Sequence, residues 1–310
     1  MSSNLSMFYQ KNGITVRNLS RDLLCLSKGE VMTSIAEYTE RFCVSRWTIQ
    51  TAIQFLLENE CMQIEKHGPK GTLIVDLNRE KLWKYADLKP LVGFAPPPST
   101  YIHDSLYTGL AAAVAKTDLP VNLGYMVPAS LRIDSLNSGR CHFVITSRLA
   151  AELFLEKYPE ISVALILEGA KYTVPYRLYA RKGRTPKVED GTRVGIYNEA
   201  IEQSYLTERL CQGKNVIRKY GNYHGCLELL AKGEIDVLVQ RGDIDKYPLQ
   251  ECAYCELTDL GVDQEVVLPV ILCSQNDYGV EVLLKKMLDV EYIASIQKEV
   301  LDGSRAPSYY

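Results

Sequence analysis

The sequence predicts a small α+β head in residues 1–77, followed by an α/β domain of two lobes in residues 91–310. The head is indicated by the order helix, helix, tight turn, helix, hairpin. From Leu91 onward, strand-like runs alternate with helical ones, which is typical of a parallel-rich sheet flanked by helices. A unit of helix, glycine and buried strand occurs twice in this second region, which favours two related lobes.

Length and charge limit the possible functions. The 310 residues suit about two domains, and a 46% hydrophobic, 24% charged composition is that of an ordinary globular protein. The net charge is −3, and residues 1–77 hold eight basic and eight acidic side chains. The whole chain is therefore not a general binder of polyanions, and any affinity for DNA must come from the local placement of charges.

The sequence also indicates the compartment. The first 13 residues contain no apolar core of the length that signal peptides have, and no run of 18 apolar residues occurs. The nine cysteines are scattered and odd in number, which suits reduced, mostly buried thiols. We therefore expect a cytoplasmic protein that does not span the membrane.

Motifs for catalysis or metal binding are weak. The stretch "CAYC" (252–255) supplies two of the four ligands of a zinc site, and no second pair stands at finger spacing. His224 and Cys226 could form a Cys–His pair only if their side chains converged in space. No phosphate-binding loop or dinucleotide-binding fingerprint occurs. We therefore expect no enzymatic activity, no metal and no cofactor.

The elements of the first 77 residues follow from local patterns. A first helix is predicted within residues 16–27, and a second begins after the N-cap Thr33, with Glu37 one residue beyond the capping-box position. Ser45 is the N-cap of a third helix that reaches about Glu60. The apolar residues of this helix recur at i, i+3, i+4, i+7 and i+8, namely Ile49, Ala52, Ile53, Leu56 and Leu57. Two strands, 62–66 and 72–77, flank "HGPKG" as a hairpin.

The third helix has the features of a helix that reads DNA. No acidic residue occurs from Phe42 to Leu57, and the face opposite the apolar stripe carries Arg, Trp, Thr and Gln. In a winged helix-turn-helix the third helix enters the major groove, while the hairpin reaches the neighbouring backbone. Phosphates lie against such a helix, so carboxylates there would be repelled. We therefore expect a double-stranded DNA operator as the partner.

This head resembles the GntR-type winged-helix regulators. Those proteins typically show a "V-S-R-x-T-[VI]" turn and an "x-G-x-G-[TS]" wing, and this chain reads "VSRWTI" (44–49) and "HGPKGTLIV" (67–75). Position 50 departs from the pattern, because it is Gln where many relatives carry a second Arg. Trp47 is bulkier than usual; it either stacks on the sugar–phosphate wall or packs under the first helix. The DNA contacts that the resemblance implies, with Trp47 included, are Ser45, Arg46, Trp47, Thr48, Gln50, His67, Lys70 and Gly71.

The remaining residues predict two lobes joined by two crossings. We interpret residues 78–90 as a partly helical linker. The stretch "DSLNSGRCHFVITSR" (134–148) aligns with "ELLAKGEIDVLVQR" (228–241), with Gly139 opposite Gly233. Lobe 1 then covers about 91–183 and 266–310, ending in a helix at about 279–301, and lobe 2 covers about 184–265. This layout predicts a type 2 periplasmic-binding-protein-like fold, with one cleft between its lobes.

In such a fold, ligands bind between the lobes at the carboxyl ends of strands, where helix N-termini favour an anion. The residues that this rule places at the cleft are Ser99, Thr100, Tyr101, Ser147, Arg148, Tyr197, Asn198, Tyr223, Gln240 and Arg241. We expect a small carboxylate or phosphate as the effector, with Arg148 or Arg241 as its clamp.

Nearly the whole chain resembles the YhfZ family of regulators. The stretches that carry the resemblance are "LVGFAPPPSTYIHDSLYTGL" (91–110), "SRLAAE" (147–152) and the terminal "PSY" (307–309). The resemblance implies a GntR-like head and a binding-protein-like C-terminal domain. It also favours Ser147 and Arg148 as residues that face the ligand. The terminal motif suggests a docked tail, for example on a partner subunit.

Together these patterns predict a homodimeric transcription regulator. Two heads would bind half-sites about one helical turn apart. A ligand that prefers closed lobes would change their spacing through the linker. Two alternatives stay open: a ligand-blind scaffold whose cleft is filled by side chains, and an enzyme built on the binding-protein fold.

Overall fold

The computed structural model describes residues 11–68, 71–87, 90–117, 120–244, 247–260, 268–275 and 279–309. The chain divides into two compact units. The N-terminal unit comprises Met1–Leu91, Val114–Asn122 and Asp277–Met287, and the two-lobed unit comprises Val92–Ala113, Leu123–Asn276 and Leu288–Tyr310. Among the described residues, no helix is both long and apolar enough to cross a membrane.

The N-terminal unit contains a winged helix-turn-helix. The chain runs through α1 (Lys11–Leu24), β1 (Val31–Met32), α2 (Ile35–Phe42), α3 (Arg46–Glu58), β2 (Met62–Lys66), β3 (Thr72–Leu77) and α4 (Arg79–Tyr85). The strands form an antiparallel sheet in the order β1-β3-β2, with β2 and β3 as the wing. The bounds of the two hairpin strands coincide with those that the sequence predicted.

The N-cap of α2 differs from the predicted residue. Ser34, rather than Thr33, is the N-cap of α2, and its Oγ accepts a hydrogen bond from the Glu37 backbone N–H at 3.2 Å. Glu37 therefore stands at the third helical position, where capping-box glutamates occur. The N-cap of α3 is Ser45, as predicted, and its Oγ accepts from the Thr48 backbone N–H at 3.1 Å.

A compact apolar core holds the head together. Leu19 and Leu23 of α1 and Ile49 and Leu56 of α3 are fully buried. The linker region is more structured than the sequence suggested, because α4 buries Trp83. A late segment also joins this unit: α10 (Val280–Met287) places Lys286 Nζ where it donates to Ser27 Oγ at 2.9 Å.

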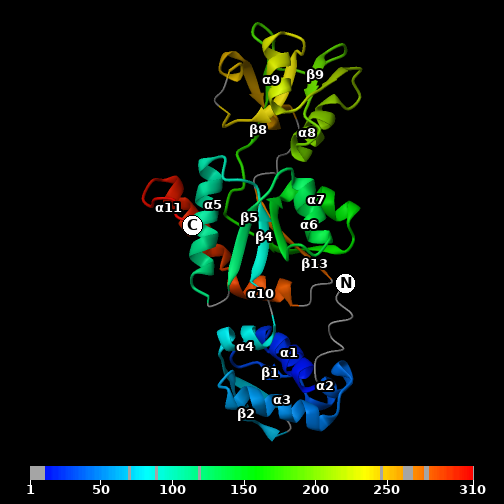
Figure 1. Cartoon of the computed structure of the whole chain (residues 1–310). Coiled ribbons are helices and arrows are strands. Elements are labelled where there is room, and N and C mark those ends of the chain that lie inside the picture. The colour runs from blue at the N-terminus through cyan, green and yellow to red at the C-terminus, as the bar shows by residue number, and fades with distance from the viewer. Residues whose placement is uncertain are drawn as a thin grey trace. The chain divides into compact units, whose positions relative to one another are not determined.

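Lobe 1 of the two-lobed unit is a five-stranded sheet covered by helices (Figure 1). Its elements are β4 (Leu91–Ala95), α5 (Tyr101–Val114), β5 (Val121–Tyr125), α6 (Ala129–Asn137), β6 (Phe143–Ser147), α7 (Arg148–Lys157), β7 (Ile161–Ile166) and β13 (Pro269–Ser274). The strand order is β5-β4-β6-β13-β7. Strands β4 and β6 are parallel, and β13 runs antiparallel to both of its neighbours.

Lobe 2 repeats this arrangement. Its elements are β8 (Tyr176–Ala180), β9 (Arg193–Ile196), α8 (Ile201–Cys211), β10 (Ile217–Tyr220), α9 (Tyr223–Ala231), β11 (Val237–Arg241) and β12 (Ala253–Glu256), with 3-10 turns at Leu249–Glu251 and Thr258–Leu260. The strand order is β10-β9-β11-β8-β12, with β8 as the antiparallel strand. Because β8 and β13 each follow a crossing and hold the same place in their sheets, the fold is type 2 periplasmic-binding-protein-like, as predicted.

The internal repeat is confirmed in detail. Helices α6 and α9 both end before a left-handed glycine, Gly139 with φ +69° and Gly233 with φ +71°. The backbone N–H of Gly139 donates to the Leu136 carbonyl at 3.0 Å, and that of Gly233 donates to the Leu230 carbonyl at 3.1 Å. Only glycine adopts such angles without strain. The same sharp helix end therefore leads into a buried strand in each lobe.

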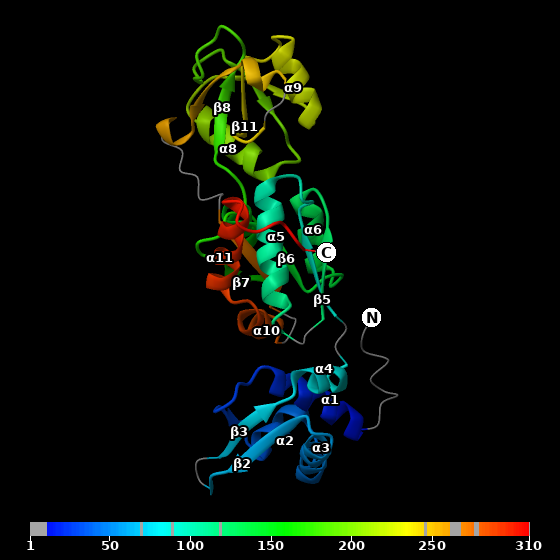
Figure 2. The ribbon, with the colours of Figure 1, turned by 90° about the vertical axis from the view of Figure 1, so that its left-hand side faces the viewer.

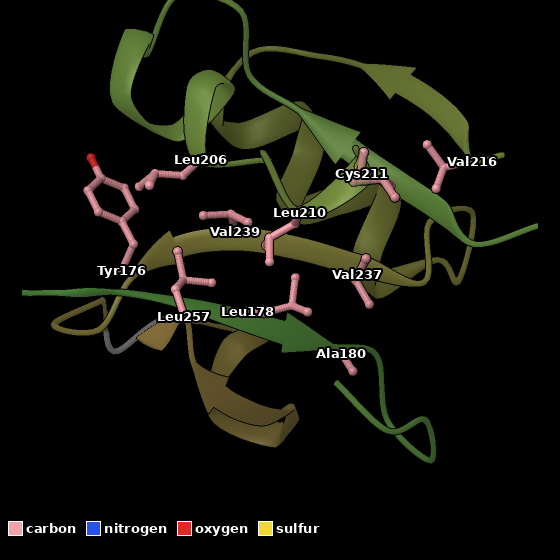
Figure 3. Close-up of a cluster of buried hydrophobic side chains, with 11 residues drawn as sticks. Tyr176, Leu178, Ala180, Leu206, Leu210, Cys211, Val216, Val237, Val239 and Leu257 are labelled. Carbon is pink, nitrogen blue, oxygen red and sulfur yellow. The ribbon is translucent and has the colours of Figure 1, made fainter. Parts of the chain in front are cut away.

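The core of lobe 2 lies between β8, β11 and α8 (Figure 3). Leu178, Val237 and Val239 of the sheet face Leu206 and Leu210 of the helix in a cluster of buried side chains. Tyr176 lies at one end of this cluster, so its ring closes the core and also faces the cavity described below.

The C-terminal region differs from the prediction. The single helix expected at 279–301 is two helices, α10 and α11 (Val290–Leu301), because Asp289 caps α11 by accepting from the Tyr292 N–H at 3.0 Å. Helix α11 lies beside α5 (Figure 2). The terminal motif docks on α5 of the same chain, where Tyr309 donates to Asp104 Oδ1 at 2.5 Å.

Candidate DNA-binding surface and effector cleft

The outer face of α3 presents polar and aromatic side chains to solvent. Arg46 and Gln50 are exposed, and Trp47 is 67% exposed. The apolar stripe of the helix faces the core instead. The exposed position of Trp47 agrees with the stacking interpretation and not with packing under the first helix. Arg46, Trp47 and Gln50 therefore form one accessible surface on the first turns of the helix.

The burial of Thr48 disagrees with its prediction as a DNA contact. Its side chain is buried, at 8% exposure, and its Oγ1 lies 2.8 Å from Ser45 Oγ. The two hydroxyl groups satisfy each other and the helix N-terminus. Ser45 is itself exposed, so it can meet a phosphate only while it also caps the helix. The role of Thr48 here is to hold the turn.

The wing depends on Gly71. This residue has φ +93°, and a Cβ on it would lie 2.8 Å from Val31 Cγ1, so a side chain would be strained and crowded. The backbone N–H of His67 donates to the Gly71 carbonyl at 2.9 Å, which closes the hairpin. The His67 ring is exposed and lies 3.6 Å from Glu65. Lys70, the predicted basic contact of the wing, lies outside the described residues.

A cavity of about 440 Å³ opens between the two lobes. Ligand pockets commonly measure about 300–1,000 Å³. One wall comes from lobe 1 and from the segment that leads to β8, and it includes Pro96, Ser99, His103, Arg132, Tyr172 and Thr173. The other wall comes from lobe 2, and it includes Tyr176, Tyr197, Glu199, Glu202 and Arg241.

Arg132 is the most unusual residue of the lobe 1 wall. Its side chain is almost entirely buried, at 3% exposure. Its Nη1 donates to the Met126 carbonyl at 2.7 Å, and its Nη2 lies 3.4 Å from the Tyr172 hydroxyl. The Nε has no partner, and no carboxylate of the described residues pairs with this guanidinium. A buried charge without a counter-ion is costly, so the site favours an anion beside Arg132.

His103 adds unsatisfied nitrogens to the same wall. It is 3% exposed, and neither ring nitrogen forms a hydrogen bond of good geometry with the described residues, although backbone groups of Pro97 and Tyr172 lie close enough to favour its protonated form. Burial, together with the Arg241 and Arg132 guanidinium groups, lowers the pKa of His103 to about 4. The ring is therefore neutral at pH 7. Thr173 Oγ1, on the same wall, is likewise buried without a partner.

The lobe 2 wall carries carboxylates. Glu202 lies in the first turn of α8, where the helix dipole stabilises its charge, and its Oε1 accepts from Ser147 Oγ at 2.9 Å. Glu199 is exposed and accepts from the Tyr197 hydroxyl at 3.3 Å. Arg241 pairs with Asp243 at 3.2 Å. Each lobe thus contributes a different charge pattern to one cavity.

Three of the predicted effector residues line this cavity: Ser99, Tyr197 and Arg241. Ser147 reaches its edge through Glu202, but its hydroxyl is buried and also caps α7 through the Ala150 N–H at 3.1 Å. The structure therefore brings together residues from both lobes, as the fold predicted, but fewer of them than the strand-end rule placed there.

The other six predicted effector residues are engaged elsewhere or do not line the cavity. Thr100 Oγ1 accepts from the His103 N–H at 3.3 Å, and Tyr101 donates to the Val300 carbonyl at 2.9 Å. Arg148 pairs with Glu152 at 3.1 Å, one helical turn away, rather than facing the cleft. The remaining three are Asn198, which is exposed, Tyr223, whose ring lies 6.5 Å from that of Tyr197, and Gln240, which is buried.

Sequence reasoning missed Arg132, His103 and Glu202. A signal was available for the first two, because each stands on the buried stripe of its helix. His103 shares a face with Leu106 and Leu110, and Arg132 precedes Leu136 by four residues. A charged or titratable side chain at a core-facing helix position often marks a functional site. Glu202 carries no such signal.

The cysteine motifs take no part in the cavity. "CAYC" ends on the edge strand β12, and the thiols of Cys252 and Cys255 donate to the carbonyls of Pro248 and Pro186, at 3.3 and 3.2 Å. The Cys226 thiol is buried and donates to the Ile196 carbonyl at 3.5 Å, whereas His224 is exposed. No group of three or more potential metal ligands occurs in the described ranges.

Comparison with known proteins agrees with this architecture. The model of the YhfZ C-terminal domain matches residues 78–309, and a helix-turn-helix domain model matches residues 27–74. The chain is 27% identical to YhfZ of Escherichia coli (strain K12), over 97% of this chain and 99% of that protein. The crystal structure of YhfZ from Shigella flexneri superimposes with a TM-score of 0.64 at 26% identity, covering 74% of this chain and 97% of that one. With both the head and the two-lobed domain accounted for, the chain belongs to the YhfZ family.

Proposed function

We propose that the chain is a DNA-binding transcription regulator whose two-lobed unit binds a small molecule with an anionic group. The head supplies an exposed surface on α3, formed by Arg46, Trp47 and Gln50, and a wing beside it. The matching helix-turn-helix domain supports double-stranded DNA as the partner of that surface. The regulator works as a homodimer, because two heads related by symmetry bind two half-sites.

The single observation that carries the ligand-binding part is Arg132. Its guanidinium is 3% exposed, lines the interlobe cavity, and pairs with no carboxylate of the described chain. A scaffold with no ligand would gain stability by filling the cavity with apolar side chains, because buried unpaired charges are destabilising. The unsatisfied ring of His103 points to the same conclusion. These groups are what a site for a small anion requires.

The ligand acts by linkage between the lobes and the head. A molecule that contacts both walls binds the closed lobes better than the open ones, so its binding shifts that equilibrium. Three segments connect the units covalently and transmit the shift. The first contains α4, and the second is Val114–Asn122. The third contains α10, which belongs to the N-terminal unit but lies in sequence between β13 and α11. Lys286 fixes α10 to that unit through Ser27.

The experiment is a thermal-shift screen of the full chain against small carboxylates and phosphates, followed by DNA binding. A ligand that binds only the folded state raises the melting temperature. The test variant is Arg132→Gln, and the control is Arg140→Gln, an exposed arginine just beyond the same helix. We expect anions that stabilise the wild type and the control but not Arg132→Gln. Equal stabilisation of all three proteins would contradict the assignment of the cavity.

A DNA test addresses the other half of the proposal. Sequences that bind the full chain are selected from a random duplex pool, and their affinities are measured by fluorescence anisotropy. Enrichment of a twofold-symmetric site supports the regulator. Failure to bind any duplex better than bulk DNA would refute the role of the head.

A further inference from the structure

We infer that the ligand of the interlobe cavity is a small zwitterion of the α-amino-acid type, with its carboxylate on Arg132 and its ammonium group on Glu202. The inference deepens the function proposed above and depends on it. It adds a cationic group that the simple picture of an anionic ligand does not contain. The argument concerns the charges of the lobe 2 wall, their position relative to Arg132, and the remaining lining.

The first step is that the carboxylates of the lobe 2 wall have no cation. Glu202 accepts a hydrogen bond from Ser147, and Glu199 accepts one from Tyr197, both from neutral hydroxyl groups. Within the described ranges, neither carboxylate forms an ion pair with Lys, Arg or His. Both line the cavity that also contains Arg132. An unpaired cation and unpaired carboxylates therefore face the same small space.

The second step is that these opposite charges line the same cavity of about 440 Å³. The Tyr172 hydroxyl, which Arg132 approaches to 3.4 Å, is influenced by both groups. Arg132 lowers the pKa of this hydroxyl while Glu202 raises it, although burial has the larger effect. Arg132 and Glu202 nevertheless do not pair directly. A ligand in the space between them can place an anionic group beside Arg132 and a cationic group beside Glu202.

The third step is that charge repulsion excludes ligands that are plain anions or plain amines. A plain anion beside Arg132 would be repelled by Glu202 and Glu199, and a plain amine beside Glu202 would be repelled by Arg132. His103 is neutral at pH 7, and Arg241 forms an ion pair with Asp243, so the charges of the lining without an ion-pair partner among the described residues are those of Arg132, Glu199 and Glu202. A zwitterion satisfies both walls at once.

The rest of the lining suits an amino acid. The rings of Tyr172, Tyr176 and Tyr197 border the cavity, and aromatic faces attract an ammonium group. Pro97, Val127 and Ile201 provide apolar surface for a side chain. The unsatisfied Thr173 hydroxyl and His103 nitrogens are available to a second carboxylate oxygen or to a polar side chain.

The position of Glu202 also gives the ammonium group a structural effect. The hydrogen bond from Ser147 to Glu202 joins the end of β6 in lobe 1 to the start of α8 in lobe 2. An ammonium group on Glu202 binds at this junction. The same carboxylate therefore recognises the ligand and contacts the opposite lobe.

The probes are the twenty standard amino acids, each with its desamino acid and its decarboxylated amine, titrated into the full chain by calorimetry. Glu202→Gln is the test variant, because Gln keeps the size and can still accept from Ser147. Glu208→Gln is the control, on the same helix and outside the cavity, where Glu208 pairs with Arg218. We expect at least one amino acid to bind at least about tenfold tighter than its desamino acid, because the desamino acid leaves Glu202 without a cationic partner; tenfold corresponds to about 1.4 kcal/mol.

In Glu202→Gln the preference for the amino acid over its desamino acid falls to about twofold or less. In Glu208→Gln this preference is unchanged. Three other outcomes overturn the inference. If desamino acids bind as tightly as amino acids, the ligand is a simple anion and the proposed function stands. If the amino acid preference survives Glu202→Gln, the ammonium site is elsewhere. If none of the three compound classes binds, the cavity is not a site for such ligands, and the proposed function loses its effector as well.

Discussion

The stability of lobe 2 provides a prediction whose size follows from the structure. Asp236 lies at the start of β11, and its carboxylate is 3% exposed. Arg193 donates to it from Nη2 at 2.6 Å and from its backbone N–H at 2.9 Å, and Arg181 donates from Nε at 3.0 Å. A third guanidinium, that of Arg184, lies 3.3 Å away. Among the described residues, this carboxylate is the only one that the three arginines share, and Asp236→Asn removes it.

The loss of unfolding free energy expected for Asp236→Asn is smaller than for a fully buried ion pair. Breaking a buried ion pair typically costs about 3–5 kcal/mol, because one charge is left without a partner. Here the three guanidinium groups are 30–39% exposed and can be hydrated again. Solvent screening therefore lowers the estimate to about 2–3 kcal/mol. With a urea m-value of about 2.5 kcal/mol/M, the unfolding midpoint falls by about 1 M.

The two tryptophans make the assay specific. Trp47 and Trp83 both lie in the N-terminal unit, so tryptophan fluorescence reports on that unit, whereas far-UV circular dichroism reports on the whole chain. In Asp236→Asn the dichroism transition moves and the fluorescence transition stays. Glu208→Gln, which removes an exposed ion pair of the same lobe, moves the midpoint little. A shift in Asp236→Asn no larger than in this control would refute the reasoning.

Three further predictions concern the head and the cleft. Arg46→Ala weakens binding to the selected operator about tenfold, measured by anisotropy, with the tryptophan unfolding transition unchanged; unaltered affinity would remove Arg46 from the DNA surface. Gly71→Ala destabilises the head by about 1–3 kcal/mol, because the left-handed backbone is strained and the new methyl meets Val31, and the fluorescence transition reports it; a neutral result would contradict the turn geometry. His103, with a folded pKa of about 4, binds its proton more readily when unfolded, so its contribution to stability is complete above about pH 6.5 and declines as the pH falls toward 4. His103→Gln therefore removes up to about 2 kcal/mol of the stability difference between pH 7 and pH 5 measured by dichroism, and an identical pH profile would show that His103 titrates normally.

Much of the fold could be predicted because it depends on local patterns. The hairpin strands alternate around a glycine-rich turn, so their bounds follow from a few neighbouring residues. The repeat was visible because Gly139 and Gly233 end equivalent helices, where a left-handed residue is required. The prediction was wrong where two neighbouring residues could fill the same structural role with nearly equal energy. Thr33 and Ser34 are both good caps, and the structure uses Ser34.

The errors in the cleft have a different physical cause. A strand-end rule identifies loops but cannot show which way each side chain turns. Tyr101 stands at a helix start, yet its hydroxyl donates to the Val300 carbonyl, nearly 200 residues later in the chain. Arg148 finds a carboxylate one turn along its own helix. The absence of a carboxylate partner for Arg132 is a property of the folded arrangement, and no spacing in the sequence reveals it.

Strand β12 escaped detection for a similar reason. Its four residues include two that are exposed, and they carry no alternating pattern of their own. They form a strand because β8 offers a free edge, with Tyr254 opposite Tyr179 and Cys255 opposite Leu178. Pairing with a distant strand, rather than intrinsic preference, decides such edge segments.

The central claim is that a small molecule held between the lobes changes the affinity of the head for DNA. The most direct measurement is operator affinity of the full chain by anisotropy, with and without a saturating ligand identified by the calorimetric titration. The account predicts a change of at least about fivefold, the lower end of common allosteric couplings, and its loss in Arg132→Gln. A ligand that binds the wild type yet leaves operator affinity unchanged would contradict it.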